Sequence, residues 1–245
     1  MSLGIMHSEY SSSGLWSGSG FDVASFRAWV RGVHARIRHA PTTLALIFIP
    51  PGLFDDAQEI LAAVREETGV QHLLGASANS MIAGAEEIED SRSLALGLYS
   101  LPGARLQTVH FSQRQVDEWN GGGYWHLESR QTAESLNSWL VFADPFSLDA
   151  ERWLRQWNDA FPGIPIMGGL ASGDYSARRI QLYQDGQIHT EGGVALAVSG
   201  AVRLKSVISQ GCTPIGETWP AWKVLSLLSG CSSNVTKSVY APITG

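Results

Sequence analysis

Apolar residues in the first part of the chain recur every three or four positions, which is the spacing of one face of an α-helix. Asp22 precedes this stripe as a candidate N-cap, and Pro41 follows it as a stop. The pattern therefore predicts an amphipathic helix that buries one face. The apolar positions of the stripe are Phe26, Trp29, Val30, Val33 and Ile37.

A different pattern follows, in which short continuous apolar runs of strand length alternate with helical stripes. In a first series we expect a strand at 43–49, a helix from Asp55 or Asp56 to Gly69, and strands at 70–77, 93–100 and 104–111. In a second series we expect a strand at 138–145, a helix from Ser147 or Asp149 to Pro162, a strand at 164–169, a hairpin at 178–189, and strands at 194–200 and 201–209. The hairpin is indicated by Asp185-Gly186, a typical two-residue turn.

The two series align at a nearly constant offset, which indicates an internal duplication. The aligned pairs are Phe48 with Phe142, Gly75 with Gly169, Leu94 with Val194, and Val109 with Val207, at offsets of 94, 94, 100 and 98 residues. We therefore predict an α/β fold of duplicated strand–helix–strand–strand units, with mixed β-sheets and flanking helices.

These patterns also suggest the domain boundaries. Residues 1–20 are rich in serine and glycine, and we expect them to be a flexible N-terminal segment. Residues 21–217 form the predicted domain, with repeats at about 43–111 and 138–209. Residues 218–245 resemble neither repeat, and we interpret them as a divergent or truncated C-terminal tail.

Composition removes several classes of function. The 245-residue chain has a net charge of −6 and no cluster of Lys and Arg, so we expect no nucleic-acid partner. The longest apolar run, at 44–49, is far shorter than a membrane span, so we expect no membrane partner. The first 21 residues lack the positive charge and apolar centre of a signal peptide, and only two cysteines, Cys212 and Cys231, are present. Together these features predict a cytoplasmic protein.

Two glycine-containing stretches lie at corresponding strands of the two series, at 73–81 and 166–175. Neither loop contains the lysine of a phosphate-binding loop, and Leu170 stands where a dinucleotide fingerprint needs glycine. Glycine lets a backbone turn sharply and approach a ligand, and short polar side chains at strand ends can bind it. The alternative is close packing between the repeats with no ligand. The candidate ligand-binding residues here are Gly75, Ser77, Asn79, Gly168, Gly169 and Ser172.

Catalytic and metal chemistry have weaker signals. The nucleophile-elbow pattern is missed by one position around both Ser77 and Ser172. Cys212 is a lone thiol, which is usually a small buried apolar residue, and its use as a nucleophile needs a lowered pKa. The acidic run at 86–90 could hold a cation, but a solvated loop is the simpler interpretation. We therefore expect no catalytic residue, no metal and no cofactor.

Three segments together resemble the FIST family, and the resemblance covers about residues 25–217. The segments are LLGASANSMIAG, VFADPFSLDAERWLRQWNDAFPGIPIMGGLASGD and VISQGCTPIG. The FIST family is the sensory module of prokaryotic signal-transduction proteins and also occurs beside F-box domains in eukaryotic ubiquitin signalling. The resemblance places the family's glycine-rich loops on 75–77 and 168–172 and its closing motif on Gln210, Gly211 and Cys212 with Pro214 and Gly216.

The resemblance implies an intracellular sensory domain without catalytic activity, which binds a small ligand such as an amino acid or a derivative. Family members usually continue into a further C-terminal domain, and the sequence after Gly216 departs from that pattern. A downstream signalling protein is then the expected partner. Two other hypotheses stay open: an enzyme of hydrolase or transferase type that uses Cys212 or a loop serine, and an unliganded protein-interaction module.

Overall fold

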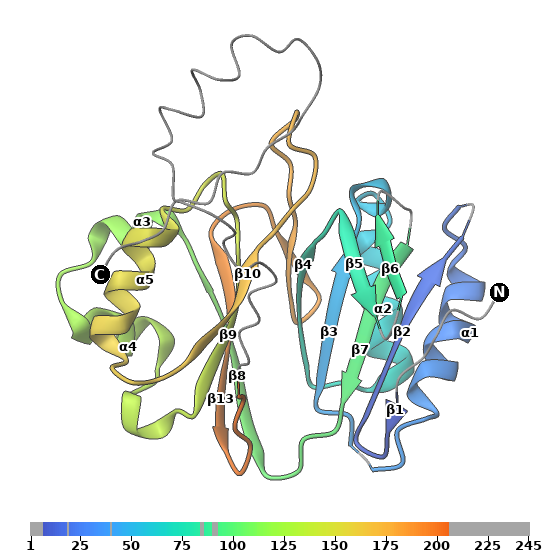
Figure 1. The fold of residues 1–245 in the computed structure, drawn as a ribbon, viewed down its shortest axis with the longest axis horizontal. Helices are drawn as coiled ribbons and strands as arrows, with labels where there is room; N and C mark the ends of the chain where they lie inside the picture. Colours follow the sequence, from blue (N-terminus) through green and yellow to red (C-terminus); the bar gives the residue numbers. More distant parts are fainter. Residues whose placement is uncertain (1–6, 19, 40, 84–85, 90–92, 206–245) are drawn as a thin grey trace, which may run out of the picture. The chain divides into compact units, whose positions relative to one another are not determined.

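The computed structural model divides the chain into two compact units, residues 1–205 and 206–245. It describes residues 7–18, 20–39, 41–83, 86–89 and 93–205, all of which belong to the first unit. Within these residues the fold is α/β, with mixed sheets and helices on their outer faces, as the sequence predicted (Figure 1). No helix in these ranges is long and apolar enough to cross a lipid bilayer.

One sheet is built mainly from the first half of the chain and, among the described residues, has seven strands. Its only parallel pair is β3–β4, and the pairs on both sides of it are antiparallel, so the sheet is mixed. In spatial order the strands are β1 (His7–Ser8), β2 (Ser11–Ser17), β7 (Ser93–Tyr99), β3 (Leu44–Ile49), β4 (His72–Ser77), β11 (Leu182–Gln184) and β12 (Gln187–His189).

The other main sheet comes from the second half of the chain and has four described strands, again with one parallel pair, β9–β10. In spatial order they are β10 (Ile166–Leu170), β9 (Ser138–Ala143), β13 (Gly193–Gly200) and β8 (Ala104–Phe111). A separate hairpin is formed by β5 (Ser80–Ala83) and β6 (Glu86–Glu89).

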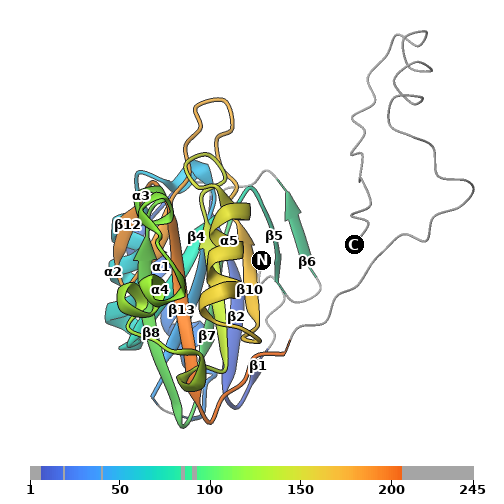
Figure 2. The ribbon, with the colours of Figure 1, turned by 90° about the vertical axis from the view of Figure 1, so that its left-hand side faces the viewer.

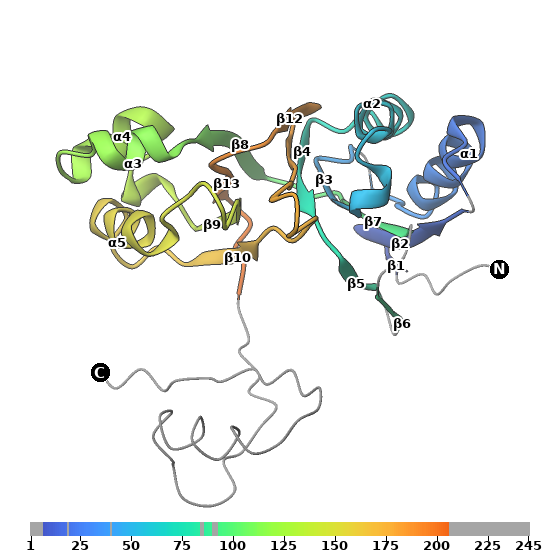
Figure 3. The same cartoon turned by 90° about the horizontal axis from the view of Figure 1, so that it is seen from above.

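Helices cover the outer face of each sheet (Figure 3). They are α1 (Val23–His34), α2 (Ala57–Thr68), α3 (Gln113–Glu118), α4 (Gly122–Ser129) and α5 (Ala150–Ala160), with single 3₁₀ turns at Pro51–Leu53 and Ala133–Ser135. The Asp22 side chain caps α1 and the Asp149 side chain caps α5, as the sequence predicted. Gly69 ends α2 in the left-handed conformation. Figure 2 shows α4 and α5 lying over the four-stranded sheet.

The alternation of side chains along each central strand explains the layering. Ala45, Ile47 and Ile49 of β3 face α1 and α2, whereas Leu44 and the other even positions face the second sheet. The two sheets therefore share an apolar core between them. Phe142 in this core and the partly buried Phe48, the residues aligned across the duplication, meet edge to face at 5.3 Å between ring centroids.

The strand pairings change the boundaries expected for the repeats. The strand at 104–111, expected in the first repeat, is β8, which pairs with β13 in the second sheet. Its structural counterpart is β2, which pairs with β7 in the same antiparallel way. The structure thus shows two similar units, β2–α1–β3–α2–β4–β7 and β8–α3–α4–β9–α5–β10–β13.

Two further expectations about strands need correction. Residues 11–17, expected in a flexible segment, form β2, because the main chain of this serine-rich stretch pairs along the whole of β7 while Leu15 and Trp16 are buried. The strand expected at 201–209 is not observed in its described part, since residues 201–205 contain no strand, and residues 206–209 lie outside the described residues. The Asp185-Gly186 hairpin turn is confirmed, with φ of 49° and 90° at its two central residues.

Candidate functional site

The two loops singled out in the sequence meet at the carboxyl ends of β4 and β10. The Ser172 N–H donates to the Ser77 carbonyl oxygen at 3.1 Å, and the Asn79 N–H donates to the Ser172 hydroxyl oxygen at 2.9 Å. The Asn79 side-chain amide also donates to the Gly173 carbonyl oxygen at 2.9 Å. The structure therefore brings Ser77, Asn79 and Ser172 together, as expected for equivalent loops of a duplicated fold.

The polar groups of these loops bind one another. The Ser77 hydroxyl is buried and accepts the Gln181 N–H at 3.1 Å, while the Ser77 N–H donates to the Gln181 carbonyl oxygen. The hydroxyls of Ser77 and Ser172 thus both accept a main-chain N–H, and neither is hydrogen-bonded to a histidine among the described contacts. These hydrogen bonds join the loop after β4 to the loop after β10. We call the contacts among Ser77, Asn79, Ser172, Gly173 and Gln181 the loop clamp.

Gly75 of β4 and Gly168 of β10 lie too close to the neighbouring strand to carry a side chain. A Cβ at Gly75 would overlap the carbonyl oxygen of Ile47 on the adjacent strand, and a Cβ at Gly168 would overlap the carbonyl oxygen of Val141. Gly75 is therefore the structural counterpart of Gly168, one position from the Gly169 expected by alignment. The shift arises because seven residues separate β3 from α2, whereas six separate β9 from α5. A Cβ at Gly169 would contact nothing within 4 Å.

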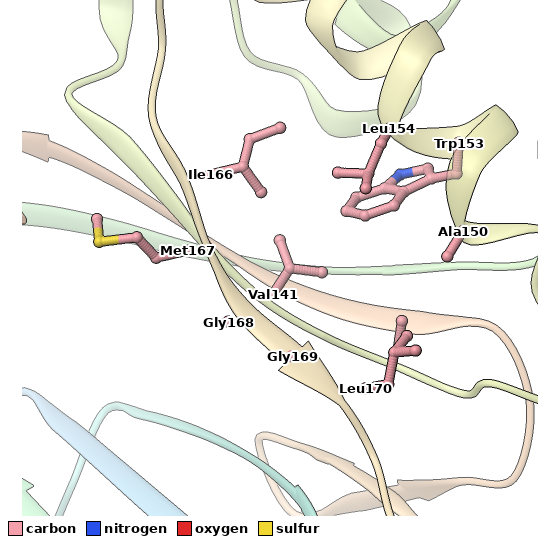
Figure 4. A pocket seen from close by; sticks show the side chains of 10 residues that line it. Val141, Ala150, Trp153, Leu154, Ile166, Met167, Gly168, Gly169 and Leu170 are labelled. Carbon is pink, nitrogen blue, oxygen red and sulfur yellow. The ribbon is translucent and has the colours of Figure 1, made fainter. Parts of the chain in front are cut away.

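Gly168 and Gly169 nevertheless line an open groove. The groove lies between β10 and the first half of α5, has a volume of about 300 Å³ and is lined almost entirely by carbon atoms (Figure 4). Trp153 and Leu154 point from α5 toward Ile166 on β10, whereas Met167 points to the other side of the strand. The remaining lining comes from Val141, Ala143, Ala150 and Leu170.

Within the described residues, the groove lies along a sheet edge that no strand covers. β10 is the terminal strand of its sheet, and no other described strand pairs with its outer side. Leu170, at the end of β10, is 58% exposed, and Leu154 in the apolar stripe of α5 is 38% exposed. An edge strand offers unpaired main-chain N–H and C=O groups, so the site combines an apolar surface with hydrogen-bonding capacity.

A separate polar cluster fastens the β11–β12 hairpin to β4 and β8. Asp185 accepts hydrogen bonds from the Leu73 N–H and the Thr108 hydroxyl. Burial raises the pKa of Asp185, but nearby His72 and these hydrogen bonds outweigh burial and hold that pKa below its usual range. The cluster lies away from the groove lining and connects the two sheets.

A histidine pair lies where β12 meets β8. The rings of His110 and His189 stack at 3.9 Å between centroids. Burial, with a smaller contribution from His110, lowers the pKa of His189 to about 4. The buried Nε2 atom of His189 has no hydrogen-bond partner within the described part of the chain. We assign the pair to the packing of the hairpin.

Sequence reasoning missed the α5 side of the groove and proposed other residues that cannot be placed. Nothing in the sequence indicated that Ala150 and Leu154 line a groove, and only the structure shows that Leu154 is 38% exposed. Gln210, Gly211 and Cys212 lie outside the described residues. Among the described residues, no group of three or more His, Cys, Asp or Glu side chains could hold a metal ion.

Comparison with known proteins identifies the family. The FIST N domain family model matches residues 43–225. The chain is 32% identical over 188 residues to "Uncharacterized protein Rv0628c" of Mycobacterium tuberculosis, a match that covers 76% of this chain and 47% of that protein. It is 30% identical over 162 residues to "Uncharacterized protein Mb0898c" of Mycobacterium bovis, covering 66% of this chain and 40% of that protein.

The chain spans about half the length of the curated relatives that it matches. The family match covers both parallel strand pairs, both glycine-containing loops and α5, so it includes the groove. The resemblance noted in the sequence is thereby confirmed. This chain belongs to the FIST N domain family, a family of sensory domains in signal transduction.

Proposed function

We propose that the chain is a ligand-binding sensory domain and that the groove between β10 and α5 receives an apolar group of a small ligand. Membership in a family of sensory domains supports the general role. The observation that carries the proposal is the open groove of about 300 Å³ beside Gly168 and Gly169. This volume is at the lower end of the range for small-molecule sites, of the order of 300–1,000 Å³.

The lining favours a particular kind of ligand. Trp153, Leu154, Ile166 and Val141 present apolar side chains, so a charged group in the groove would lose hydration without a compensating partner. The outer edge of β10, with which no described strand pairs, can hydrogen-bond an uncharged amide. An amino-acid derivative with blocked amino and carboxyl groups satisfies both conditions better than a free amino acid does.

In this proposal the loop residues have a supporting role. Ser77, Asn79 and Ser172 hold the carboxyl ends of β4 and β10 together through the clamp. Gly168 and Gly169 are the candidate ligand-binding residues within the described part of the chain. We further propose that the domain acts in the cytoplasm without catalysing a reaction, and that a downstream signalling protein receives the signal.

A thermal-shift panel tests the proposal. The panel compares N-acetyl amides of tyrosine, phenylalanine, leucine and alanine with the corresponding free amino acids. At a hundredfold excess over Kd, a ligand that binds only the folded protein stabilises it by about 2.7 kcal/mol. We expect the blocked derivatives with large side chains to raise Tm, and the alanine derivative and the free amino acids to have little effect.

Two variants locate the binding. Ala150→Leu adds apolar volume to the groove, and we expect it to abolish the shifts. Ala177→Leu makes the same change at an exposed loop position and serves as the matched control. A panel without any shift would refute ligand binding in the groove, and shifts that persist in Ala150→Leu would place the binding elsewhere.

A further inference from the structure

The groove has a structural counterpart in the first half of the molecule. β3, α2 and β4 correspond to β9, α5 and β10, and Gly75 takes the place of Gly168 against the neighbouring strand. Six apolar residues line the groove from β9, α5 and β10: Val141, Ala143, Ala150, Trp153, Leu154 and Ile166. Their counterparts are Ile47, Ile49, Ala57, Ile60, Leu61 and Leu73, and all six belong to the core cluster that contains Tyr183.

In the first half this position is filled by a strand. β11 pairs antiparallel with the outer edge of β4, and Tyr183 stands directly opposite Gly75. The Tyr183 side chain is 0% exposed, and its hydroxyl donates to the Gln181 side-chain oxygen at 3.0 Å. The aromatic ring of Tyr183, from the added strand, lies in the core cluster formed with α2.

In the second half the same position is open. β10 is the counterpart of β4, but no described strand pairs with its outer edge, and the groove lies beside it. An antiparallel strand added to this edge would place one residue opposite Gly168. The side chain of that residue would point toward α5, as Tyr183 points toward α2.

We propose that the groove and the free edge of β10 form a β-strand-addition site for an extended peptide. The peptide runs antiparallel to β10 and places an aromatic or other large apolar side chain opposite Gly168. Its main chain hydrogen-bonds to β10, and its side chain fills the groove, which is the general mode of peptide recognition at sheet edges. This inference rests on the proposed function, because it assigns a ligand class to the same groove.

The hairpin at the corresponding point of the chain does not occupy the site. β5 follows β4 along the chain as β11 follows β10. Ile82, the penultimate residue of β5, therefore corresponds in position to Tyr183, the penultimate residue of β11. Ile82 is 74% exposed, and β5 packs instead through Met81 against Leu15 and Ala95 of the first sheet. We therefore assign the groove to a peptide of a partner protein.

The chain itself supplies the probe. A fluorescently labelled peptide with the sequence of residues 180–185, Ile-Gln-Leu-Tyr-Gln-Asp, blocked at both ends, reproduces the strand that fills the first half. We expect saturable binding to the whole protein, measured by fluorescence anisotropy. The same peptide carrying Tyr183→Ala should bind at least tenfold more weakly, because it lacks the ring that fills the groove.

Two comparisons separate strand addition from simple apolar binding. A peptide methylated on alternate main-chain nitrogens keeps its tyrosine but cannot donate to β10, and we expect a loss of at least tenfold. The Ala150→Leu protein should lose at least tenfold, whereas Ala177→Leu should bind as the unmodified protein does. Equal binding of the methylated and unmethylated peptides would overturn strand addition, while N-acetyl-tyrosine amide could still bind and leave the proposed function intact.

A final variant tests the competing occupant. Ile82→Asp places a charge on β5, so β5 can no longer enter an apolar groove. We expect unchanged peptide affinity in this variant. Tighter peptide binding would overturn the assignment, because it would show that β5 of the same chain occupies the site. Absence of binding by the unmodified peptide would also overturn it.

Discussion

β4 and β10 are equivalent strands that differ in what lies at their outer edges. β4 is covered by β11, and Tyr183 is buried opposite Gly75. Among the described strands, β10 is the last of its sheet, and the groove beside Gly168 is open there. The two strand–helix–strand units have the same strand pairing, and this shared architecture stabilises both halves. The difference between their outer edges singles out the edge of β10 as the binding site.

The comparison also separates the loop clamp, to which both halves contribute, from the groove, which lies in the second half. The loop clamp is formed by both halves, and its polar groups are paired with one another. In the part of the chain that the structure describes, the groove is found in the second half and its counterpart in the first half is filled. The loop clamp is explained by packing between the halves, so it says little about function. The groove beside β10 has no such packing role and indicates where a ligand can enter.

We expect the largest change in stability at the outer edge of β4, which β11 covers. Tyr183→Ala removes a fully buried aromatic side chain, and we expect the free energy of unfolding to fall by about 3–5 kcal/mol in urea denaturation. Tyr183→Phe retains the ring and removes the hydrogen bond to Gln181, so it should cost about 1 kcal/mol. If Tyr183→Ala lowers the free energy of unfolding less than Tyr183→Phe does, burial of the Tyr183 ring does not stabilise the first half.

The two glycines come next. Gly75→Ala and Gly168→Ala each bring a methyl group against a main-chain carbonyl oxygen that cannot move independently, and Gly168 also has a φ of 138°. We expect each substitution to lower the free energy of unfolding by about 3 kcal/mol. Gly169→Ala is the matched control, because its methyl group enters open space, and it should change stability by less than about 1 kcal/mol. A cost at Gly169 equal to that at Gly168 would contradict this account of the strand.

The sequence predicted the local features of the fold well. The Asp22 cap, the stop at Gly69 and the Asp185-Gly186 turn depend on a few neighbouring residues, and each is confirmed. The sheet to which β8 belongs could not be read from its residues, because strand pairing depends on partners distant in the sequence. The serine-rich β2 was missed for the same reason.

The site was harder to predict than the fold. The glycine-containing loops attracted attention, but glycine is needed there because of the adjacent strand, a reason visible only once β3 and β9 are placed. The groove is lined by ordinary apolar residues such as Leu154 and Val141, and nothing in their spacing shows that they are left uncovered by the described strands. An uncovered sheet edge is a property of the whole topology.

We expect a pH dependence where β12 meets β8, beside the strand β11 that covers β4. The pKa of His189 is lowered to about 4, chiefly by burial, so the folded protein keeps this histidine neutral between pH 6.5 and 4 while the unfolded chain takes up a proton. Stability therefore falls as the pH decreases through this window. The side chain is partly exposed, so we expect a loss of about 1–2 kcal/mol and no more.

The measurement is urea denaturation at pH 7 and pH 4.5, with His189→Gln as the control. The variant removes this titration, so its loss of stability over the interval should be smaller by that amount. His110 is the neighbouring titratable group and is left in place in both proteins. An equal loss in the variant would show that the β12–β8 contact does not respond to protonation of His189.

The smallest effect is expected at the loop clamp. Ser172→Ala leaves the Asn79 N–H without the hydroxyl that accepts it, and we expect the free energy of unfolding to fall by about 1 kcal/mol. If the clamp only joins the two sheets, the same variant should bind the tyrosine-containing peptide with an affinity within twofold of the unmodified protein. A large loss of affinity with unchanged stability would mean that the loop serine contacts the ligand, and the distinction drawn between the shared clamp and the one-sided groove would then be wrong.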